Sequence, residues 1–212
     1  MSRLAAFLIL PFVALVASPV SADDWITLFD GADLSKWEVI GNKMENWKIE
    51  DGILYCAKGG GWLATKEEFG DFELEVEFKV YPDANSGVFL RAPKKGDPAW
   101  DGLEVQILDN DSPKLGELKP YQFCGGLYGC DGPAANLGKI GEWQKFKIMA
   151  KGRNIQVIWN DKPSINTDLD KVKNPEKKHT GLNRTSGHVG LQAHGGRVDF
   201  RKVRIKRLSK SS

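Results

Sequence analysis

Glu104 and Gln106 place an acid and an amide on one face of a strand-like segment, WDGLEVQILDN at residues 100–110. Three apolar residues alternate with them, and side chains two positions apart share a face of a strand. The apolar row predicts the core side, so Glu104 and Gln106 point outward. A carboxyl can transfer a proton and an amide can bind a hydroxyl, so this face becomes a site if neighbouring strands add complementary groups.

Two other strand-like segments carry such groups at equivalent positions. Arg91 opposes an apolar row in SGVFLRAP, residues 86–93, and Gln192 and His194 oppose one in HVGLQAHG, residues 188–195. Charged residues on the outer face of a strand are usually only solvated. The three segments together nevertheless supply an acid, a base, a guanidinium and two amides.

Small and aromatic residues accompany these polar groups, which favours a site over a plain solvated face. Gly87 and Gly190 lie on the same faces and leave room for a ligand to approach the backbone. Phe89 offers a sugar an apolar surface for stacking. Trp62 and Trp100 border loops and are the other candidates for stacking against a sugar.

The elements that must position these residues are β-strands. Strand-like runs occupy residues 46–57, 71–82, 86–93, 102–109, 143–152, 153–161, 188–195 and 197–208. No segment shows sustained helical periodicity, and residues 110–141 and 163–186 are predicted to be long loops. Many short strands with one apolar face each predict an all-β jelly-roll sandwich of two antiparallel sheets, one of them curved with a concave ligand face.

The N-terminus predicts export. Residues 1–22 have one positive charge, a short apolar run interrupted by Pro11, and small residues up to Ala22, as in a secretory signal peptide. Residues 23–212 then form one jelly-roll domain that is secreted or periplasmic, with no membrane span. The formal net charge of +2 is too balanced for a nucleic-acid binder.

Three cysteines leave the disulfide pairing open. Cys124 and Cys130 bracket a short Gly-rich segment that a hairpin could bridge, and Cys56 could instead pair with either of them. No cysteine pair has a histidine at the spacing of a zinc site. Asp109 lies in LDNDS, residues 108–112, which is the one candidate calcium loop and is more typical of a plain turn.

Six segments in a fixed order resemble the 3-keto-disaccharide hydrolase family. They are ITLFDGADLSKWEV, NWKIEDGIL, DANSGVFLRAP, GLEVQILDN, GEWQKFKIMAKGRNIQVIWND and GHVGLQAHGGRVDFRKVRIKRL. The resemblance covers residues 26–208. It implies a concanavalin A-like jelly roll and an exported enzyme that cleaves glycosides whose sugar carries a ketone at carbon 3. The family's polar positions map onto Asn85, Arg91, Glu104, Gln106, Asp109, Gln192 and His194.

The chemistry of such a substrate indicates what these residues could do. A ketone at C3 makes the C2 hydrogen acidic, and the glycosidic oxygen at C1 can then leave by elimination. Either Glu104 or His194 suits the base, and the other member of the pair could protonate the leaving oxygen. Arg91 suits the enolate oxygen, and Gln106 and Gln192 suit the sugar hydroxyls. Water added to the unsaturated product completes a net hydrolysis.

The metal dependence stays open at this point. A divalent ion could replace Arg91 as the group that stabilises the enolate, with Glu104 and His194 as its ligands. The sequence requires no cofactor.

Two other functions remain as alternatives. A laminarinase-type retaining glucanase would use Glu104 and Asp109 as its carboxyl pair, but five positions separate them and Gln106 stands where an Asp is expected. A non-catalytic carbohydrate-binding module would suit the same fold and the same aromatic residues. The catalytic hypothesis requires that Arg91, Glu104 and His194 lie in one cleft.

Overall fold

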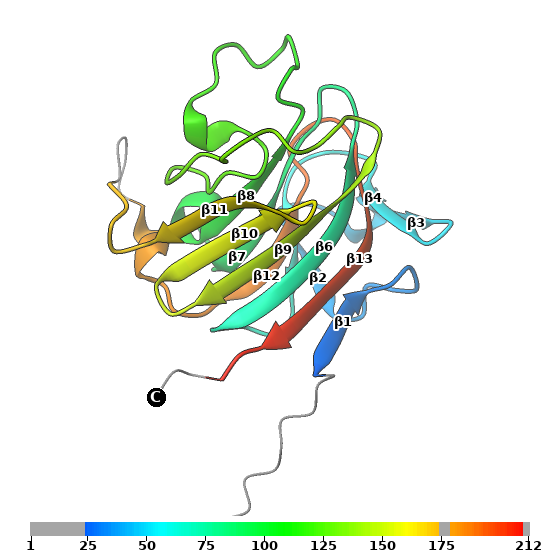
Figure 1. The fold of residues 1–212 in the computed structure, drawn as a ribbon. Helices are drawn as coiled ribbons and strands as arrows, with labels where there is room; N and C mark the ends of the chain where they lie inside the picture. Colours follow the sequence, from blue (N-terminus) through cyan, green and yellow to red (C-terminus); the bar gives the residue numbers. More distant parts are fainter. Residues whose placement is uncertain (1–23, 174–178, 210–212) are drawn as a thin grey trace, which may run out of the picture.

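Thirteen β-strands form two stacked antiparallel sheets within residues 24–173 and 179–209, which the computed structural model describes (Figure 1). The predicted signal peptide falls outside these described residues. The all-β jelly-roll prediction is confirmed. No helix in the described ranges is long and apolar enough to span a membrane.

The larger sheet has eight strands, in the order β11-β10-β9-β6-β13-β4-β3, with β1 paired to β13. Their bounds are β1 Trp25–Phe29, β3 Trp47–Glu50, β4 Ile53–Cys56, β6 Phe72–Val80, β9 Trp143–Lys151, β10 Asn154–Trp159, β11 Lys162–Asp168 and β13 Val198–Arg207. Neighbours far apart in the sequence, such as β6 and β13, lie side by side in the centre of this sheet (Figure 1).

The smaller sheet has five strands, in the order β2-β5-β12-β7-β8. Their bounds are β2 Trp37–Ile40, β5 Trp62–Thr65, β7 Asn85–Ala92, β8 Leu103–Leu108 and β12 His188–Gln192. The short helices are α1 Pro98–Asp101 and the 3₁₀ turns η1 Met44–Asn46, η2 Pro120–Gln122 and η3 Thr180–Asn183. The strands that carry Glu104 and Arg91, β8 and β7, are adjacent here, and β12, the strand before His194, pairs with the other side of β7.

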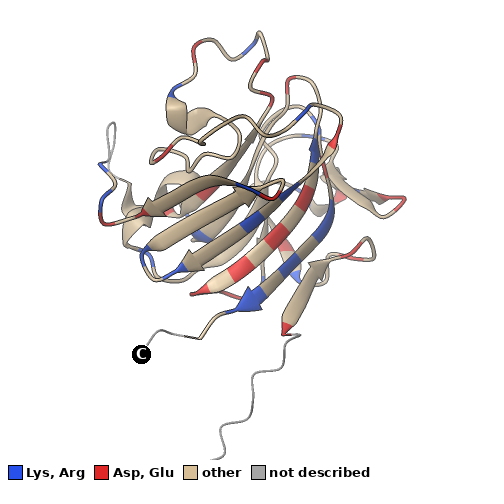
Figure 2. Cartoon of the chain, viewed as in Figure 1, with Lys and Arg blue, Asp and Glu red and all other residues tan. Residues whose placement is uncertain are grey.

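In the central strands of the larger sheet, side chains alternate strictly between the core and the outer face. The apolar residues of β6 are at most 1% exposed, and its glutamates alternate with them on the outer face. Figure 2 shows acidic residues along β6 beside basic residues along β13, where Arg204 pairs with Glu75 at 2.7 Å. One row of each strand therefore builds the core, and the other forms cross-strand ion pairs.

The core between the sheets matches the apolar rows of the sequence. Leu103, Val105 and Ile107 of β8 are fully buried, as are Val88 and Leu90 of β7. A register slip of one residue would expose such a row, at about 1.5–3 kcal/mol for each large side chain. The predicted core rows of these two strands are therefore correct.

Strand β11 was not predicted, because residues 163–186 were expected to form a loop. The sequence of β11, KPSINTD, lacks a clean apolar alternation and contains Pro163. Since β11 pairs only with β10, at the edge of the sheet, it tolerates a residue with no N–H donor. Residues 162–168 therefore form a strand because they pair with β10, and not because of a local sequence pattern.

The second face of β8 is not solvated as the alternation suggests. The segment Gly125–Tyr128 runs along its edge: Gly125 N–H donates to the Gln106 carbonyl at 2.8 Å, and Tyr128 N–H donates to the Glu104 carbonyl at 2.8 Å. All six residues of β8 are buried. The predicted loop over residues 110–141 therefore covers the strand that it follows.

None of the predicted disulfide pairings is formed. Cys56, Cys124 and Cys130 are all free thiols. Burial raises the pKa of Cys124 and that of Cys130 to about 12, so both remain protonated.

Candidate active site

A cleft opens over the outward face of the smaller sheet, above β7, β8 and β12. It has two lobes, of about 260 and 400 Å³. Asp97, Gln192 and His194 line both lobes and therefore mark their junction. The first, which we call the polar lobe, also includes Glu104 and Gln106.

The second, which we call the glycine-rich lobe, has a different lining. Its remaining residues are Ile40, Gly41, Gly60, Gly61, Trp62, Phe89, Gly96, Pro98 and Ala193. Eight of the ten predicted site residues thus line the cleft: Asn85, Glu104, Gln106, Gln192, Trp100 and His194 in the polar lobe or at the junction, and Trp62 and Phe89 in the glycine-rich lobe.

Backbone pairing on both sides holds His194 at the junction. Ala193 exchanges two hydrogen bonds with the glycine turn after β4, from Gly60 N–H at 2.6 Å and to the Gly61 carbonyl at 2.9 Å. Gly195 exchanges two more with Asn85, at 2.7 and 3.0 Å. The imidazole itself is exposed, so it can meet a ligand without a rearrangement of the chain.

Glu104 is the most perturbed carboxyl of the cleft. Its side chain is buried, with only 3% of the residue exposed. Burial, and to a smaller extent the charge of Asp97, raises its pKa to about 8. Glu104 therefore keeps its proton at neutral pH, so its carboxyl group can donate a hydrogen bond.

Gly87 makes the space that Glu104 occupies. A Cβ atom added at Gly87 would lie 2.0 Å from Glu104 Oε1 and 2.8 Å from its Cδ. The two residues are on adjacent strands, where Gly87 pairs with Gln106. The glycine that suggested room for a ligand instead makes room for the carboxyl group.

We expect Gly87→Ala to lower kcat about 10²-fold with little loss of stability. The added methyl group must push the carboxyl aside, and a displacement near 1 Å can cost that factor. The Glu104 carboxyl is the free end of a flexible side chain, so the strands need not separate. Turnover measured beside a thermal melt checks this result.

Gly70→Ala is the matched control, because its new Cβ would lie 3.4 Å from the Thr185 carbonyl oxygen, an ordinary contact. If Gly87→Ala retained wild-type turnover, the position of the Glu104 carboxyl would not matter to the reaction.

Trp62 and Phe89 form the floor of the glycine-rich lobe and are more buried than predicted. They are 4% and 1% exposed, and their rings meet edge to face at 5.3 Å. Gly190 lies beneath Trp62, since a Cβ there would come within 2.2 Å of the indole. The indole therefore fills the space over Gly190 that was predicted for a ligand.

Arg91 does not lie in the cleft, and its predicted catalytic position is wrong. It has φ of 50°, and the pairing of β7 with β12 shifts register between Phe89 and Ala92. This β-bulge breaks the alternation of side chains, so counting alternate residues along β7 assigns Arg91 to the wrong face.

The guanidinium of Arg91 is fully buried in contacts between the sheets. It donates to the carbonyls of Gly70 and Gly152, both at 2.9 Å, and pairs with Asp71 at 3.1 Å. Arg91 therefore fastens β7 of the smaller sheet to the ends of β6 and β9 in the larger one.

Asp109 also lies outside the cleft lining, contrary to the predicted substrate contact. Its carboxyl accepts hydrogen bonds from Asp83 N–H at 2.9 Å and Asp111 N–H at 3.2 Å, which stabilises the turn after β8. The glucanase alternative thereby loses its second carboxyl. Among residues 24–173 and 179–209, no three His, Cys, Asp or Glu side chains converge as a metal site.

Sequence reasoning missed a wall of the polar lobe. The missed residues are Asp97, Ala99, Leu108, Leu115, Leu118, Gln122 and Tyr128. Tyr128 packs edge to face against Trp100, with ring centroids 5.6 Å apart, and burial raises its pKa. Most of this wall comes from loops, whose side chains have no periodic signal to place them.

Trp100 is itself supported from behind by His179. Their ring centroids are 5.1 Å apart, and His179 is 3% exposed. Burial lowers the pKa of His179, so the ring stays neutral beneath the indole.

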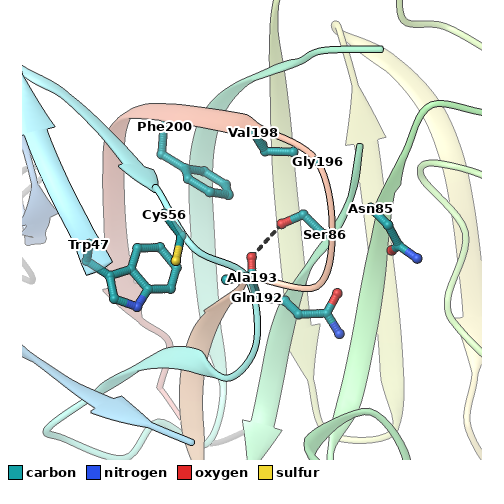
Figure 3. Close-up of a pocket in the computed structure, with 10 residues that line it drawn as sticks. Trp47, Cys56, Asn85, Ser86, Gln192, Ala193, Gly196, Val198 and Phe200 are labelled. Carbon is teal, nitrogen blue, oxygen red and sulfur yellow. Dashed lines mark hydrogen bonds between the residues drawn. The ribbon is translucent and has the colours of Figure 1, made fainter. Parts of the chain in front are cut away.

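A much smaller void of about 10 Å³ lies on the other side of Gln192, between the sheets (Figure 3). Ser86 Oγ donates to the Gln192 carbonyl at 2.7 Å beside this void. Figure 3 shows Trp47, Cys56 and Phe200 on its far side. The void is too small for a sugar, and the Ser86 hydroxyl beside it holds the backbone of Gln192.

The jelly-roll sandwich is a fold found in lectin domains, and a cleft with convergent carboxyl, imidazole and amide groups over one sheet is typical of a ligand site. Residues 24–206 match the family model for the 3-keto-alpha-glucoside-1,2-lyase-like domain. The chain belongs to this family. It is 30% identical to a 3-keto-disaccharide hydrolase of Bacteroides thetaiotaomicron, over 90% of this chain and 80% of that one.

Solved structures agree with this assignment. A candidate glycosyl hydrolase from Parabacteroides distasonis has a TM-score of 0.77 and 31% identity, over 87% of this chain and 99% of that one. A second one from the same organism has a TM-score of 0.74 at 22% identity, over 89% and 95%, and supports the fold alone. The chain is therefore a hydrolase that acts on carbohydrate.

Proposed function

We propose that the protein cleaves 3-keto-glycosides, including 3-keto-disaccharides, by elimination across C1–C2 followed by addition of water. The observation that carries this proposal is the pairing of two groups in one cleft. A buried Glu104 that is protonated at neutral pH lines the same lobe as the exposed His194. The family's lyase-like description and the relative's hydrolase name differ only by the second step, the addition of water.

In the first step, His194 accepts the C2 proton and the electrons of the C2–H bond form an enolate with the C3 oxygen. Protonated Glu104 donates a hydrogen bond to that oxygen, as neutral carboxylic acids do for enolates in apolar sites. Because Arg91 lies elsewhere, Glu104 takes the role predicted for the guanidinium. The amides of Gln106 and Gln192 are the candidate donors to sugar hydroxyls.

In the second step, the enolate collapses to a C1–C2 double bond, and the glycosidic oxygen leaves C1 with the bonding electrons. The His194 imidazolium gives its proton to this oxygen, which restores the neutral ring. C1 and C2 are bonded neighbours, so one group at the junction of the lobes can serve both atoms. Water added across the double bond yields the free 3-keto sugar.

We also propose that residues 1–22 are a signal peptide and that residues 23–212 are the exported domain. The support is the sequence pattern described above, with its cleavage site near Ala22. A secreted or periplasmic location would bring the enzyme to glycosides outside the cytoplasm. N-terminal sequencing of the exported protein tests this assignment.

The assay of function compares a 3-keto-disaccharide with its unoxidised parent. We expect turnover of the keto substrate only, and exchange of its C2 hydrogen in heavy water. His194→Ala should lower kcat about 10²–10⁴-fold, since it removes both proton transfers. Its fold should persist, because the side chain is exposed.

Lys202→Ala, on the outer face of the opposite sheet, is the control variant and should keep full activity. Binding of unoxidised disaccharides without turnover of the keto substrate would instead indicate a binding module. Hydrolysis of the unoxidised parent would indicate a glucanase. Turnover before and after chelation decides whether a divalent ion takes part.

A further inference from the structure

We propose that the glycine-rich lobe is the leaving-group subsite and that it selects apolar or aromatic aglycones. This inference rests on the proposed function, because it assigns the two halves of a 3-keto-glycoside to the two lobes. It adds an orientation of the substrate and a class of leaving group. Three observations carry it: the chemistry of each lobe, the position of His194, and the build of the rim.

The two lobes differ in hydrogen-bonding capacity. Beyond the shared junction, the polar lobe contains side chains with amide, carboxyl or hydroxyl groups: Asn85, Glu104, Gln106, Gln122 and Tyr128. The glycine-rich lobe has none outside the junction, and its side chains are Ile40, Trp62, Phe89, Pro98 and Ala193. A sugar loses water from several hydroxyls on binding, and the polar lobe offers more side-chain groups to replace those hydrogen bonds. The glycine-rich lobe offers only backbone groups and the Trp62 indole N–H besides the junction residues.

The position of the reacting groups agrees with this assignment. Glu104 lines only the polar lobe, so the C3 oxygen that it contacts must lie there. His194 lines both lobes, which is where the C1 oxygen passes from the sugar to the leaving group. The leaving group then extends over Trp62 and Phe89.

The rim of the glycine-rich lobe is made of backbone. Gly41, Gly60, Gly61 and Gly96 all have positive φ, and a Cβ at Gly61 would lie 2.2 Å from the Ile40 carbonyl oxygen. Side chains are therefore excluded by the turn geometry itself, which keeps the lobe wide. A wide lobe with apolar walls recognises its occupant by shape and apolar contact.

The test compares three 3-keto-glucosides that differ only in the leaving group: methyl, phenyl and glucosyl. We expect kcat/KM for the phenyl substrate to exceed that for the methyl substrate at least tenfold. Part of that ratio reflects the better leaving group, so the test of the subsite is the change in this ratio between variants and wild type. Ile40→Asn, which puts an amide on the apolar wall, should reduce the phenyl-to-methyl ratio at least fivefold.

Leu118→Asn is the matched control, because it makes the same change in chemistry on the wall of the polar lobe. It should change kcat/KM for all three substrates by a common factor. A ratio altered by Leu118→Asn and not by Ile40→Asn would overturn the proposal, because it would reverse the two lobes. A ratio unaffected by both variants would also overturn it.

A binding measurement separates this inference from the proposed function. Calorimetry with unoxidised phenyl and methyl glucosides requires no turnover, and Ile40→Asn should weaken only the binding of phenyl glucoside. If no 3-keto-glycoside is turned over, the proposed function fails, and this binding pattern still decides whether the lobe is an apolar subsite. Equal weakening of both glucosides would contradict the subsite.

Discussion

Replacing Arg91 with alanine lowers the free energy of unfolding by about 3–5 kcal/mol, the expected cost of removing one partner of a buried ion pair. Arg91 donates to Gly70 and Gly152 and pairs with Asp71, so its loss leaves buried acceptors at the ends of β6 and β9 unsatisfied. The total free energy of unfolding of a natural domain is about 5–15 kcal/mol, so this loss is a large fraction of it. Urea unfolding followed by tryptophan fluorescence measures the change.

Two variants sharpen this experiment. Arg91→Lys keeps the charge but loses the planar fork, so it should recover only part of the stability. Arg204→Ala removes an exposed arginine that pairs with Glu75, and we expect a change below about 1 kcal/mol. An Arg91→Ala protein with wild-type stability and no activity would return Arg91 to a catalytic role.

Glu104→Gln should abolish most turnover and at the same time stabilise the protein at alkaline pH. In the proposed mechanism the Glu104 carboxylic acid stabilises the enolate oxygen, and loss of one such donor lowers kcat about 10²–10³-fold. The glutamine cannot ionise, so it avoids burying a charge when the pH rises above the pKa of about 8 that Glu104 has in the folded state.

The pH dependence follows from the raised pKa of Glu104. An unfolded glutamate titrates near pKa 4.3, so between about pH 4.3 and 8 the folded state binds one proton more than the unfolded state. Wild-type stability is therefore highest below that window and falls as the pH rises through it, by at most about 1.4 kcal/mol per pH unit. The variant lacks this loss.

The difference in unfolding free energy between Glu104→Gln and wild type isolates this one group, because all other titrations are common to both. Glu142→Gln, at an exposed carboxyl, is the control and should show no such window. A difference that stayed constant from pH 5 to pH 9 would mean that Glu104 is ionised when folded. Its proposed role as the hydrogen-bond donor to the enolate oxygen would then fail.

The positions of Glu104 and His194 show what a local sequence pattern can predict, namely which face of the sheet a side chain occupies. Glu104 faces outward because Leu103 and Val105 on either side of it face the core. His194 faces outward because it continues the alternation of Val189, Leu191 and Ala193, so in both cases the alternation is local to the strand. The same alternation fails at Arg91, because a bulge in β7 turns its side chain toward the larger sheet. A bulge depends on the pairing with β12, which lies about a hundred residues further along the chain.

The sequence by itself determined the two-sheet architecture, the core rows and the family, because these depend on alternation and on the order of motifs. Only the tertiary structure decided that Glu104 is protonated at neutral pH. Its pKa rises because the covering segment Gly125–Tyr128, Gly87 and Asp97 come together from separate loops and strands. Desolvation and charge act through space, so no spacing along the chain encodes them.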